Sequence, residues 1–273
     1  MTTANPVQDV GEQVAESQPM GWVARTGLAA RALVYLAMGW LAVLVAAGGR
    51  ADVDQRGVLS EVLSRPMGAA VVAAMALGFG GYAVWRLSEA AFGVKGEDAA
   101  VPRVKSLARG LAYGVLAFGA VSLLAGTRAS QSGEQTQLAG TVMQQTGGHW
   151  LVAAAGVIVA GVGVTMLYEG WSSAFMRCFG YLPQPRRRVI VWLGSVGTVS
   201  RGIVILVTGA LIIVAAWTTQ PDKAGGIDEA FRTLLDQPYG GLLVAALGCG
   251  LIVFGIYGLA EAVWRRVPDG QPA

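Results

Sequence analysis

The sequence predicts an all-α, polytopic membrane protein with six transmembrane helices. Three observations support this class: charged residues make up only 14% of the 273 residues, hydrophobic residues make up 54%, and the apolar residues gather in six long runs. Soluble domains usually carry about 25% charged residues, so this chain could not cover a soluble surface. Disorder is excluded because it would leave too much apolar surface in water.

Each of the six apolar runs is close to the roughly 20 residues that cross a bilayer as a helix. Backbone groups in hydrocarbon must satisfy one another, which favours helices, and the runs do not alternate as barrel strands do. The runs cover residues 32–49, 66–85, 110–127, 147–168, 202–219 and 238–260. A further short helix on the inner membrane face is expected before the fifth run, around Trp192, and at the equivalent Trp22.

Basic residues predict the orientation of these spans. Of the 20 Lys and Arg residues, 14 fall on the side that holds both termini, the second loop and the fourth loop. Cytoplasmic loops of membrane proteins carry such an excess of positive charge. The polar N-terminus lacks the basic and apolar regions of a signal peptide. We therefore expect both termini to be cytoplasmic.

Three sets of evenly spaced landmarks indicate an internal repeat. Each set holds an Arg in the first run of a pair, a Gly at the turn before the second run, and a Glu at its end. The Gly precedes the Glu by 21 residues in every set, and the Arg precedes it by 58, 60 and 60 residues. The sets are Arg31, Gly68 and Glu89; Arg109, Gly148 and Glu169; and Arg201, Gly240 and Glu261.

These landmarks predict three parallel repeats, each a helical hairpin with both ends in the cytoplasm. Parallel repeats imply an axis along the membrane normal, so the simplest packing is a pseudo-threefold bundle, and a linear row is the alternative. We expect a polar cytoplasmic tail over residues 1–24 and repeats over residues 25–93, 103–175 and 192–266. Each outer loop holds a short amphipathic segment that we expect to lie on the membrane interface, at residues 54–64, 134–145 and 226–236.

The third copy, LLDQPYGGLLVAALGCGLIVFGIYGLAEA, shows the repeat most clearly: an amphipathic segment, a Gln-Pro-aromatic-Gly turn and a Gly-rich helix that ends in Glu. This pattern resembles the bacterial domain-of-unknown-function family 1206, over roughly residues 25 to 266. The resemblance implies three tandem repeats in a multi-helix membrane protein of bacteria and implies no activity. The second copy departs from the pattern, because Gly147 replaces the turn proline and His149 follows the glycine.

The Arg and Glu landmarks lie near the cytoplasmic ends of their spans, where antiparallel partners bring them to the same depth. We expect three ion pairs, Arg31–Glu89, Arg109–Glu169 and Arg201–Glu261, or the same charges paired between neighbouring repeats. Such pairs would act as a structural clasp; around a threefold axis they could instead form a ring that gates a cytoplasmic pathway.

The sequence offers no catalytic, cofactor-binding or metal-binding residues. It has no nucleophile-and-base constellation, no phosphate-binding loop and no HExxH or CxxC motif. The single His149 cannot supply a multi-His metal site, and Cys178 and Cys249 have no short spacing. We therefore expect a protein that is not an enzyme and needs no cofactor.

Two functions are favoured over the remaining possibilities of an enzyme or a sensor. The first is a non-enzymatic structural or accessory component of the bacterial cytoplasmic membrane, since polar residues are scarce deep in the spans. The second is a small-solute transporter or channel with a cytoplasmic ring of Arg–Glu pairs. The expected partners are the lipid bilayer and other membrane proteins. Nucleic acid is excluded because no basic domain lies outside the membrane, and the oligomeric state stays open.

Overall fold

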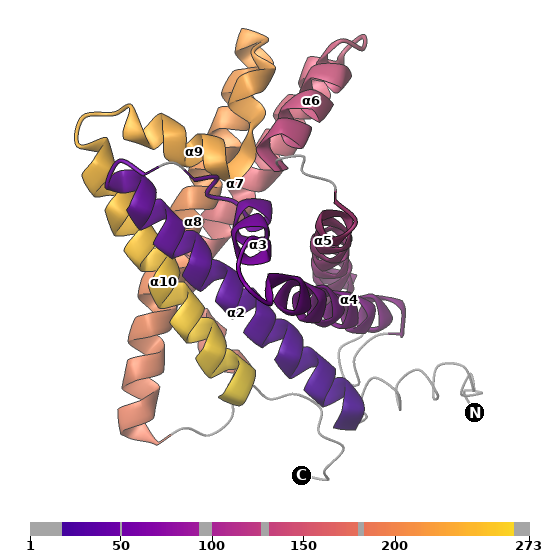
Figure 1. Ribbon diagram of the computed structural model, residues 1–273, viewed down its shortest axis with the longest axis vertical. Helices are drawn as coiled ribbons and strands as arrows, with labels where there is room; N and C mark the ends of the chain where they lie inside the picture. The colour runs from indigo at the N-terminus through magenta and orange to yellow at the C-terminus, as the bar shows by residue number, and fades with distance from the viewer. Residues whose placement is uncertain (1–17, 50, 93–99, 127–130, 180–182, 265–273) are drawn as a thin grey trace. The chain divides into compact units, whose positions relative to one another are not determined.

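A computed structural model describes residues 18–49, 51–92, 100–126, 131–179 and 183–264, most of which are helical (Figure 1). Within these residues, six helices are long and apolar enough to cross a membrane, which confirms the all-α class and the six predicted spans. They are α2 (Gln18–Ala46), α4 (Gly68–Phe92), α5 (Ala100–Leu124), α7 (Gly148–Ser172), α8 (Gln184–Thr218) and α10 (Gly240–Trp264). Most of the predicted tail and the last residues of the third predicted repeat lie outside the described residues.

The amphipathic segments also form helices. They are α3 (Gln55–Leu63), α6 (Gln131–Met143) and α9 (Gly226–Leu235). Helix α3 buries Val58 and Leu59, and α9 buries Ala230 and Phe231, whereas α6 buries no residue completely. Two short 3₁₀ turns, η1 (Ala174–Cys178) and η2 (Pro221–Ala224), precede α8 and α9.

The chain divides into two compact units, and α2 and α10 each contribute to both. Unit 1 comprises residues 1–31, 62–127 and 261–273. Unit 2 comprises residues 32–61 and 128–260.

Unit 1 is centred on the packing of α4 against α5. Aromatic side chains fill the contact: the rings of Tyr82 and Tyr113 lie 4.4 Å apart between centroids, and those of Phe79 and Tyr113 lie 6.0 Å apart. Tyr82 and Phe79 are almost fully buried. At Gly110 of α5 an added Cβ would lie 2.8 Å from the side chain of Leu87, so this glycine lets the two helices approach closely.

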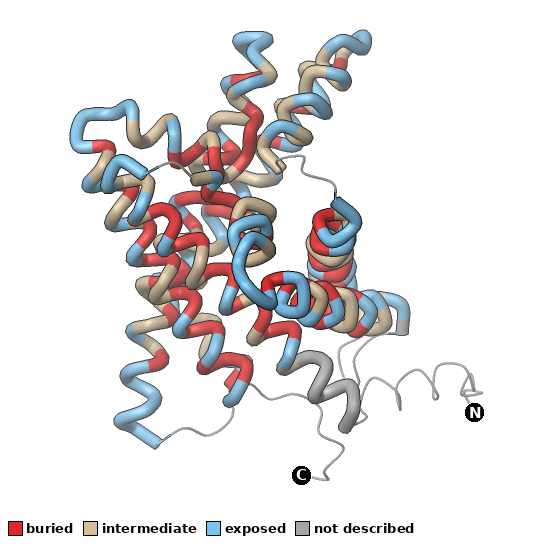
Figure 2. Tube along the Cα trace, in the orientation of Figure 1, coloured by how far each residue is buried: buried red, intermediate tan, exposed pale blue. Residues whose placement is uncertain are grey.

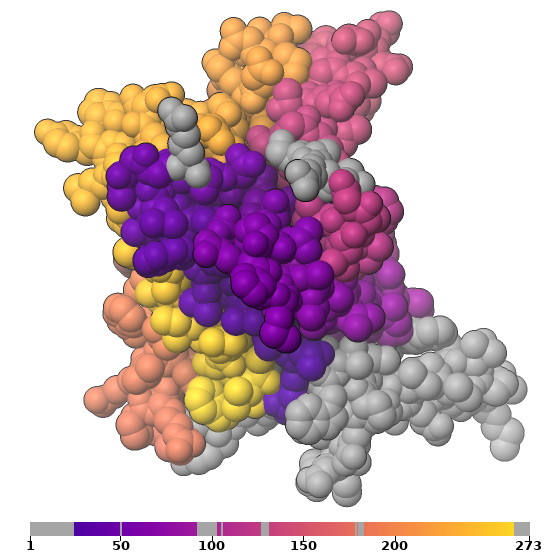
Figure 3. Space-filling model, viewed as in Figure 1, coloured from indigo at the N-terminus to yellow at the C-terminus, as the bar shows by residue number. Residues whose placement is uncertain are grey.

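Unit 2 holds α7 and α8 side by side, with α8 also contacting α10 and α10 contacting α2. Figures 1 and 3 show α2 running beside α10. Glycines permit this contact, because an added Cβ at Gly39 would lie 2.5 Å from the carbonyl oxygen of Gly248. At Gly197 of α8 an added Cβ would lie 2.5 Å from the Cα of Phe254. Close backbone approach through small residues is how helices associate in membranes.

The same pairing of spans recurs in three places. Helix α4 packs on α5, α7 packs on α8, and α10 packs on α2. In every case the second span of one repeat meets the first span of another repeat. The pseudo-threefold bundle predicted from the repeats stays a prediction.

One sequence expectation is wrong: the apolar stretch before the fifth run does not form a helix of its own. Trp192 lies inside α8, which runs without interruption through 35 residues. The stretch has no proline between Arg186 and Arg201, and its glycines Gly194 and Gly197 are accommodated within the helix. Figure 2 shows the first turns of α8 as an exposed end.

Candidate functional site

Glu261, the charged landmark at the end of the last span, forms an ion pair with a residue of another repeat. The guanidinium of Arg31 on α2 forms an ion pair with the carboxylate of Glu261 on α10. Side-chain exposure is only 15% for Arg31 and 7% for Glu261, so both charges are largely removed from solvent. The pair forms because α10 packs on α2, which places Glu261 beside Arg31.

A second arginine on α2, Arg25, caps the C-terminal end of α10. Arg25 donates hydrogen bonds from one guanidinium nitrogen to the carbonyl oxygens of Ala262 and Val263, at 3.1 and 2.6 Å. The last carbonyls of a helix have no partner within the helix, and a cation there also offsets the helix dipole. Arg25 and Arg31 therefore tie the first span to the last one.

The corresponding carboxylate on α4 has different partners. Glu89 accepts a hydrogen bond from Arg86, one turn earlier on the same helix, at 2.6 Å, and one from the Ser106 hydroxyl of α5 at 3.1 Å. The Arg86 guanidinium lies over the Trp85 ring, 4.3 Å from its centroid, and Arg86 Nε donates to the Tyr82 hydroxyl. Arg86 is thus a buried cation held by a carboxylate, a phenol and an aromatic face.

The remaining charged landmarks do not form the expected pairs within a repeat. The Arg201 guanidinium lies over the rings of Tyr35 and Phe254, 4.9 and 5.1 Å from their centroids. Arg109 is exposed on α5, and Glu169 is half-buried near the end of α7. Within the described part of the chain, neither Arg201 nor Glu169 has an ion pair, so the expected pairs Arg109–Glu169 and Arg201–Glu261 do not form.

The turn glycines occupy one geometry in all three repeats. The amides of Gly68, Gly148 and Gly240 donate to the carbonyl three residues earlier, at 2.9, 2.8 and 2.8 Å. An added Cβ at each would collide with a carbonyl oxygen of the preceding amphipathic helix. The residue before each glycine has a positive φ: 63° at Met67, 77° at Gly147 and 61° at Tyr239.

The amphipathic helices are joined to one another by polar contacts in unit 2. Asp228 of α9 accepts a hydrogen bond from the backbone N–H of Val53 at 2.9 Å and one from Arg232 at 2.7 Å. Arg232 also reaches Asp52 at 3.1 Å. The hydrogen bond to Asp228 raises the pKa of Arg232 above its ordinary value, so this guanidinium stays charged.

Helix α3 makes equivalent contacts with α6. Arg56 forms an ion pair with Glu134 at 2.5 Å, and Gln131 donates a hydrogen bond to Gln55 at 3.2 Å. Helix α3 itself is capped by Asp54, whose carboxylate accepts from the N–H of Gly57 at 2.7 Å. Burial raises the pKa of Asp54, and the nearby Asp228 and Asp52 raise it further.

Comparison with known proteins decides the family. The family described as Domain of Unknown Function (DUF1206) matches residues 26–93, 104–173 and 196–265, in the three-repeat layout expected from the sequence. The chain belongs to this family. It is also similar to the uncharacterized protein YxxB of Bacillus subtilis (strain 168), with 26% identity over 249 residues that cover 89% of this chain and 90% of that protein. No solved structure matches the chain.

Several of these contacts in the DUF1206 repeats were not predicted from the sequence. Arg86, Ser106 and Arg25 were not singled out, and neither was the link between Asp228 and Val53. Arg86 and Glu89 are three residues apart on one helix, so their spacing was a usable signal for a pair. The contacts of Asp228 and Arg25 join residues more than 170 positions apart, and no local pattern predicts them.

Proposed function

We propose that this DUF1206 protein is a non-enzymatic structural or accessory component of the bacterial cytoplasmic membrane, with both termini in the cytoplasm. The observation that supports it is the use of the charged side chains. Arg31 and Arg25 hold the last span to the first, and Glu89 holds Arg86 and Ser106. Charges inside membrane proteins often serve transport, but these charges are occupied in joining helices.

The alternative is a small-solute transporter or channel gated by a ring of Arg–Glu pairs. A ring of this kind needs equivalent contacts in the three repeats. The six charges differ from repeat to repeat. Arg31 pairs with Glu261 between repeats, Glu89 is held by Arg86 and Ser106, and Arg201 lies over aromatic rings. Arg109 is exposed and Glu169 is half-buried. This asymmetry favours the structural role over the gate.

Reconstitution in liposomes separates the two functions. The purified protein is expected to leave the passage of protons, potassium and small sugars at the level of protein-free liposomes. In native membranes a short chemical cross-linker should yield an adduct of constant mass with another membrane protein. A saturable flux that the Arg31→Glu variant abolishes would establish the transporter instead, and the absence of any adduct would contradict the accessory role.

The orientation has its own test. Reporter enzymes fused after Ala99 and after Gln184 should both report the cytoplasm, because each fusion point follows an even number of spans. The positive charge of the two loops supports this orientation. A periplasmic signal at one of the two positions would contradict it.

A further inference from the structure

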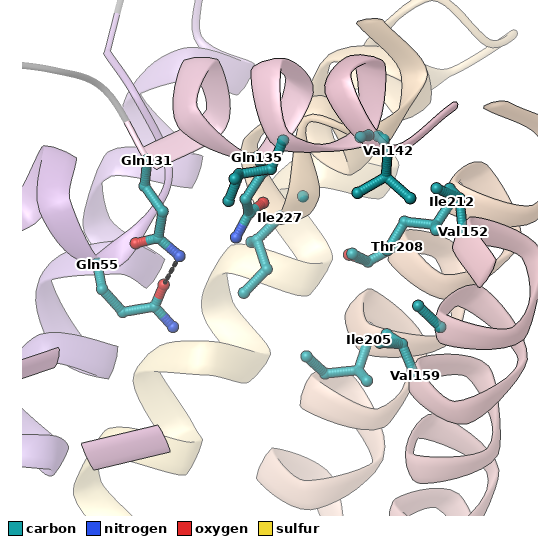
Figure 4. A pocket seen from close by; sticks show the side chains of 15 residues that line it. Gln55, Gln131, Gln135, Val142, Val152, Val159, Ile205, Thr208, Ile212 and Ile227 are labelled. Atoms are coloured by element: carbon teal, nitrogen blue, oxygen red, sulfur yellow. Dashed lines mark hydrogen bonds between the residues drawn. The ribbon is translucent and has the colours of Figure 1, made fainter. Parts of the chain in front are cut away.

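Unit 2 contains a cavity of about 400 Å³ between α6, α7 and α8. This volume falls in the range of small-molecule sites. Figure 4 shows two kinds of lining: glutamine amides gather on one side, and the side chains of Val159 and Ile205 lie on the other. The cavity is therefore amphipathic along its length.

The cavity exists because one repeat has a small residue where the others have large ones. Nine residues before the turn glycine, the first repeat has Leu59 and the third has Phe231, and both side chains are almost completely buried. The second repeat has Ala139 at this position, and Ala139 lines the cavity. Helix α6 thus lacks the large buried side chain that α3 and α9 have at this position.

The apolar part of the cavity follows the spans. On α7 the lining runs from Val152 to Val159, a distance of roughly 10 Å along the helix axis. The hydroxyl of Thr208 also faces the cavity, but it already donates to the carbonyl of Val204 at 2.9 Å. This part suits a hydrocarbon chain and offers little to a polar ligand.

The polar side of the cavity is uncharged. The hydrogen bond from Gln131 to Gln55 uses one of the two N–H donors of Gln131 and one of the two lone pairs of the Gln55 carbonyl oxygen. Both amides can therefore form further hydrogen bonds. Gln135 adds a third amide. No charged side chain is among the residues that line the cavity, and the neighbouring Arg56 and Glu134 form an ion pair with each other. A neutral head group with hydroxyls matches these amides better than an ionised one does.

We propose that this cavity binds a single-chain amphiphile with an uncharged, hydroxyl-bearing head, of which a monoacylglycerol is the simplest example. The chain lies along α7 and α8, and the head bonds the glutamines at the start of α3 and α6. This inference does not depend on the proposed structural role, because it concerns a ligand of one repeat and not the partner of the whole protein.

The test uses 1-monooleoylglycerol that carries a photoreactive diazirine in its chain, added to the purified full-length protein in detergent. Two variants fill the cavity: Ala139→Phe restores the large residue of the third repeat, and Ala155→Phe adds a ring from α7. Ala154→Phe is the matched control, because Ala154 is exposed on the same helix and does not line the cavity. Circular dichroism and gel filtration check that each variant is folded.

Labelling should fall about tenfold in both cavity-filling variants and stay within about twofold in the Ala154→Phe control, a difference of about 1.4 kcal/mol per factor of ten. Labelled peptides should come from α6, α7 and α8. Equal labelling of the folded variants, or labels spread over all six spans, would show that the probe binds only as surrounding lipid and would overturn the proposal.

Competition identifies the head group and its source. Unlabelled monooleoylglycerol should displace the probe, while oleate at pH 8 and dioleoylphosphatidylglycerol should compete at least about tenfold less well, because both carry a charge. Gln135→Leu should reduce this difference between the competitors. The probe should still label the same peptides in this variant as in the wild type. If the phospholipid competes as well as monooleoylglycerol, the cavity holds a chain of the bilayer itself and the selectivity for an uncharged head is refuted.

Discussion

Arg31 and Glu261 lie 230 positions apart in the sequence and form an ion pair that joins the first span to the last. The contact links repeats and not the two helices of one hairpin. It has a structural counterpart in the glycine contact of Gly39 and Gly248 further along the same two helices. The first span and the last span are therefore tied to each other at two levels.

Reversal of one charge in this pair should be strongly destabilising. Breaking a buried pair leaves an uncompensated charge, which typically costs about 3–5 kcal/mol. Arg31→Glu and Glu261→Arg should each lower the melting temperature in detergent, and the combination of both should recover most of the loss. The control is Arg31→Glu with Glu89→Arg, which should give no recovery. Rescue by Glu89→Arg and not by Glu261→Arg would assign the pair to a single repeat.

The turns before the second spans should respond in opposite ways to substitutions at neighbouring positions. Gly68→Ala should be destabilising, because the added methyl group collides with a carbonyl oxygen of α3. Met67→Gly should be neutral or stabilising by up to about 1 kcal/mol, because Met67 has a φ of 63°, which glycine adopts at little cost. Thermal unfolding in detergent measures both effects.

A matched control for the turn glycine lies within a span. Gly161→Ala should be tolerated, because an added Cβ there meets nothing within 4 Å. If Gly161→Ala costs as much stability as Gly68→Ala, the collision with α3 is not the reason for the turn glycine.

Asp54 should make stability depend on pH. Burial raises the pKa of Asp54 above its ordinary value of 3.8, so the folded state favours the protonated acid. The contribution of Asp54 to stability is therefore greatest below pH 3.8 and falls as the pH rises through the raised pKa of Asp54. Asp54→Asn keeps a side chain that caps α3 and removes the charge, so it should raise the melting temperature at pH 7 and lose this advantage at pH 4.

The helix cap provides the control for this pH effect. Asp54→Ala removes the hydrogen bond to Gly57 as well as the charge, so it should be about 1 kcal/mol less stable than Asp54→Asn at every pH. A constant difference between Asp54→Asn and the wild type from pH 4 to pH 8 would show that Asp54 does not titrate in this range.

The contact between α9 and the segment before α3 should depend on Asp228 far more than on Asp52. Asp228 is buried and satisfies both Val53 and Arg232, so Asp228→Ala leaves a buried N–H without its partner and should cost about 1–3 kcal/mol. Asp52→Ala removes only an exposed contact and should cost less than about 1 kcal/mol. Hydrogen exchange at Val53, followed by mass spectrometry, should accelerate in Asp228→Ala alone. Equal acceleration in both variants would contradict this assignment.

Much of the fold is predictable from the sequence because it depends on local patterns. The apolar runs define the six spans, and the amphipathic segments define α3, α6 and α9. Spacing alone also places Gly68, Gly148 and Gly240 at one turn geometry. These features follow from residues close together in the chain, where hydrophobicity and turn chemistry decide the structure.

The partners of the charged residues are not predictable in the same way. The repeat places Arg31, Arg109 and Arg201 at equivalent positions, yet the three side chains have different environments. These environments depend on which helices pack together, and on single replacements such as Ala139 for Leu59 or Phe231.

Disulfide trapping tests most directly whether the first and last repeats are joined through α2 and α10. Ala32 and Gly258 face each other, because a Cβ built on Gly258 lies 3.0 Å from that of Ala32. In a variant without Cys178 and Cys249, Ala32→Cys and Gly258→Cys are combined with a protease site between residues 93 and 99. After oxidation in membranes and cleavage, the two fragments should remain joined until a reductant is added. Separation of the fragments without a reductant would contradict the packing of α2 on α10.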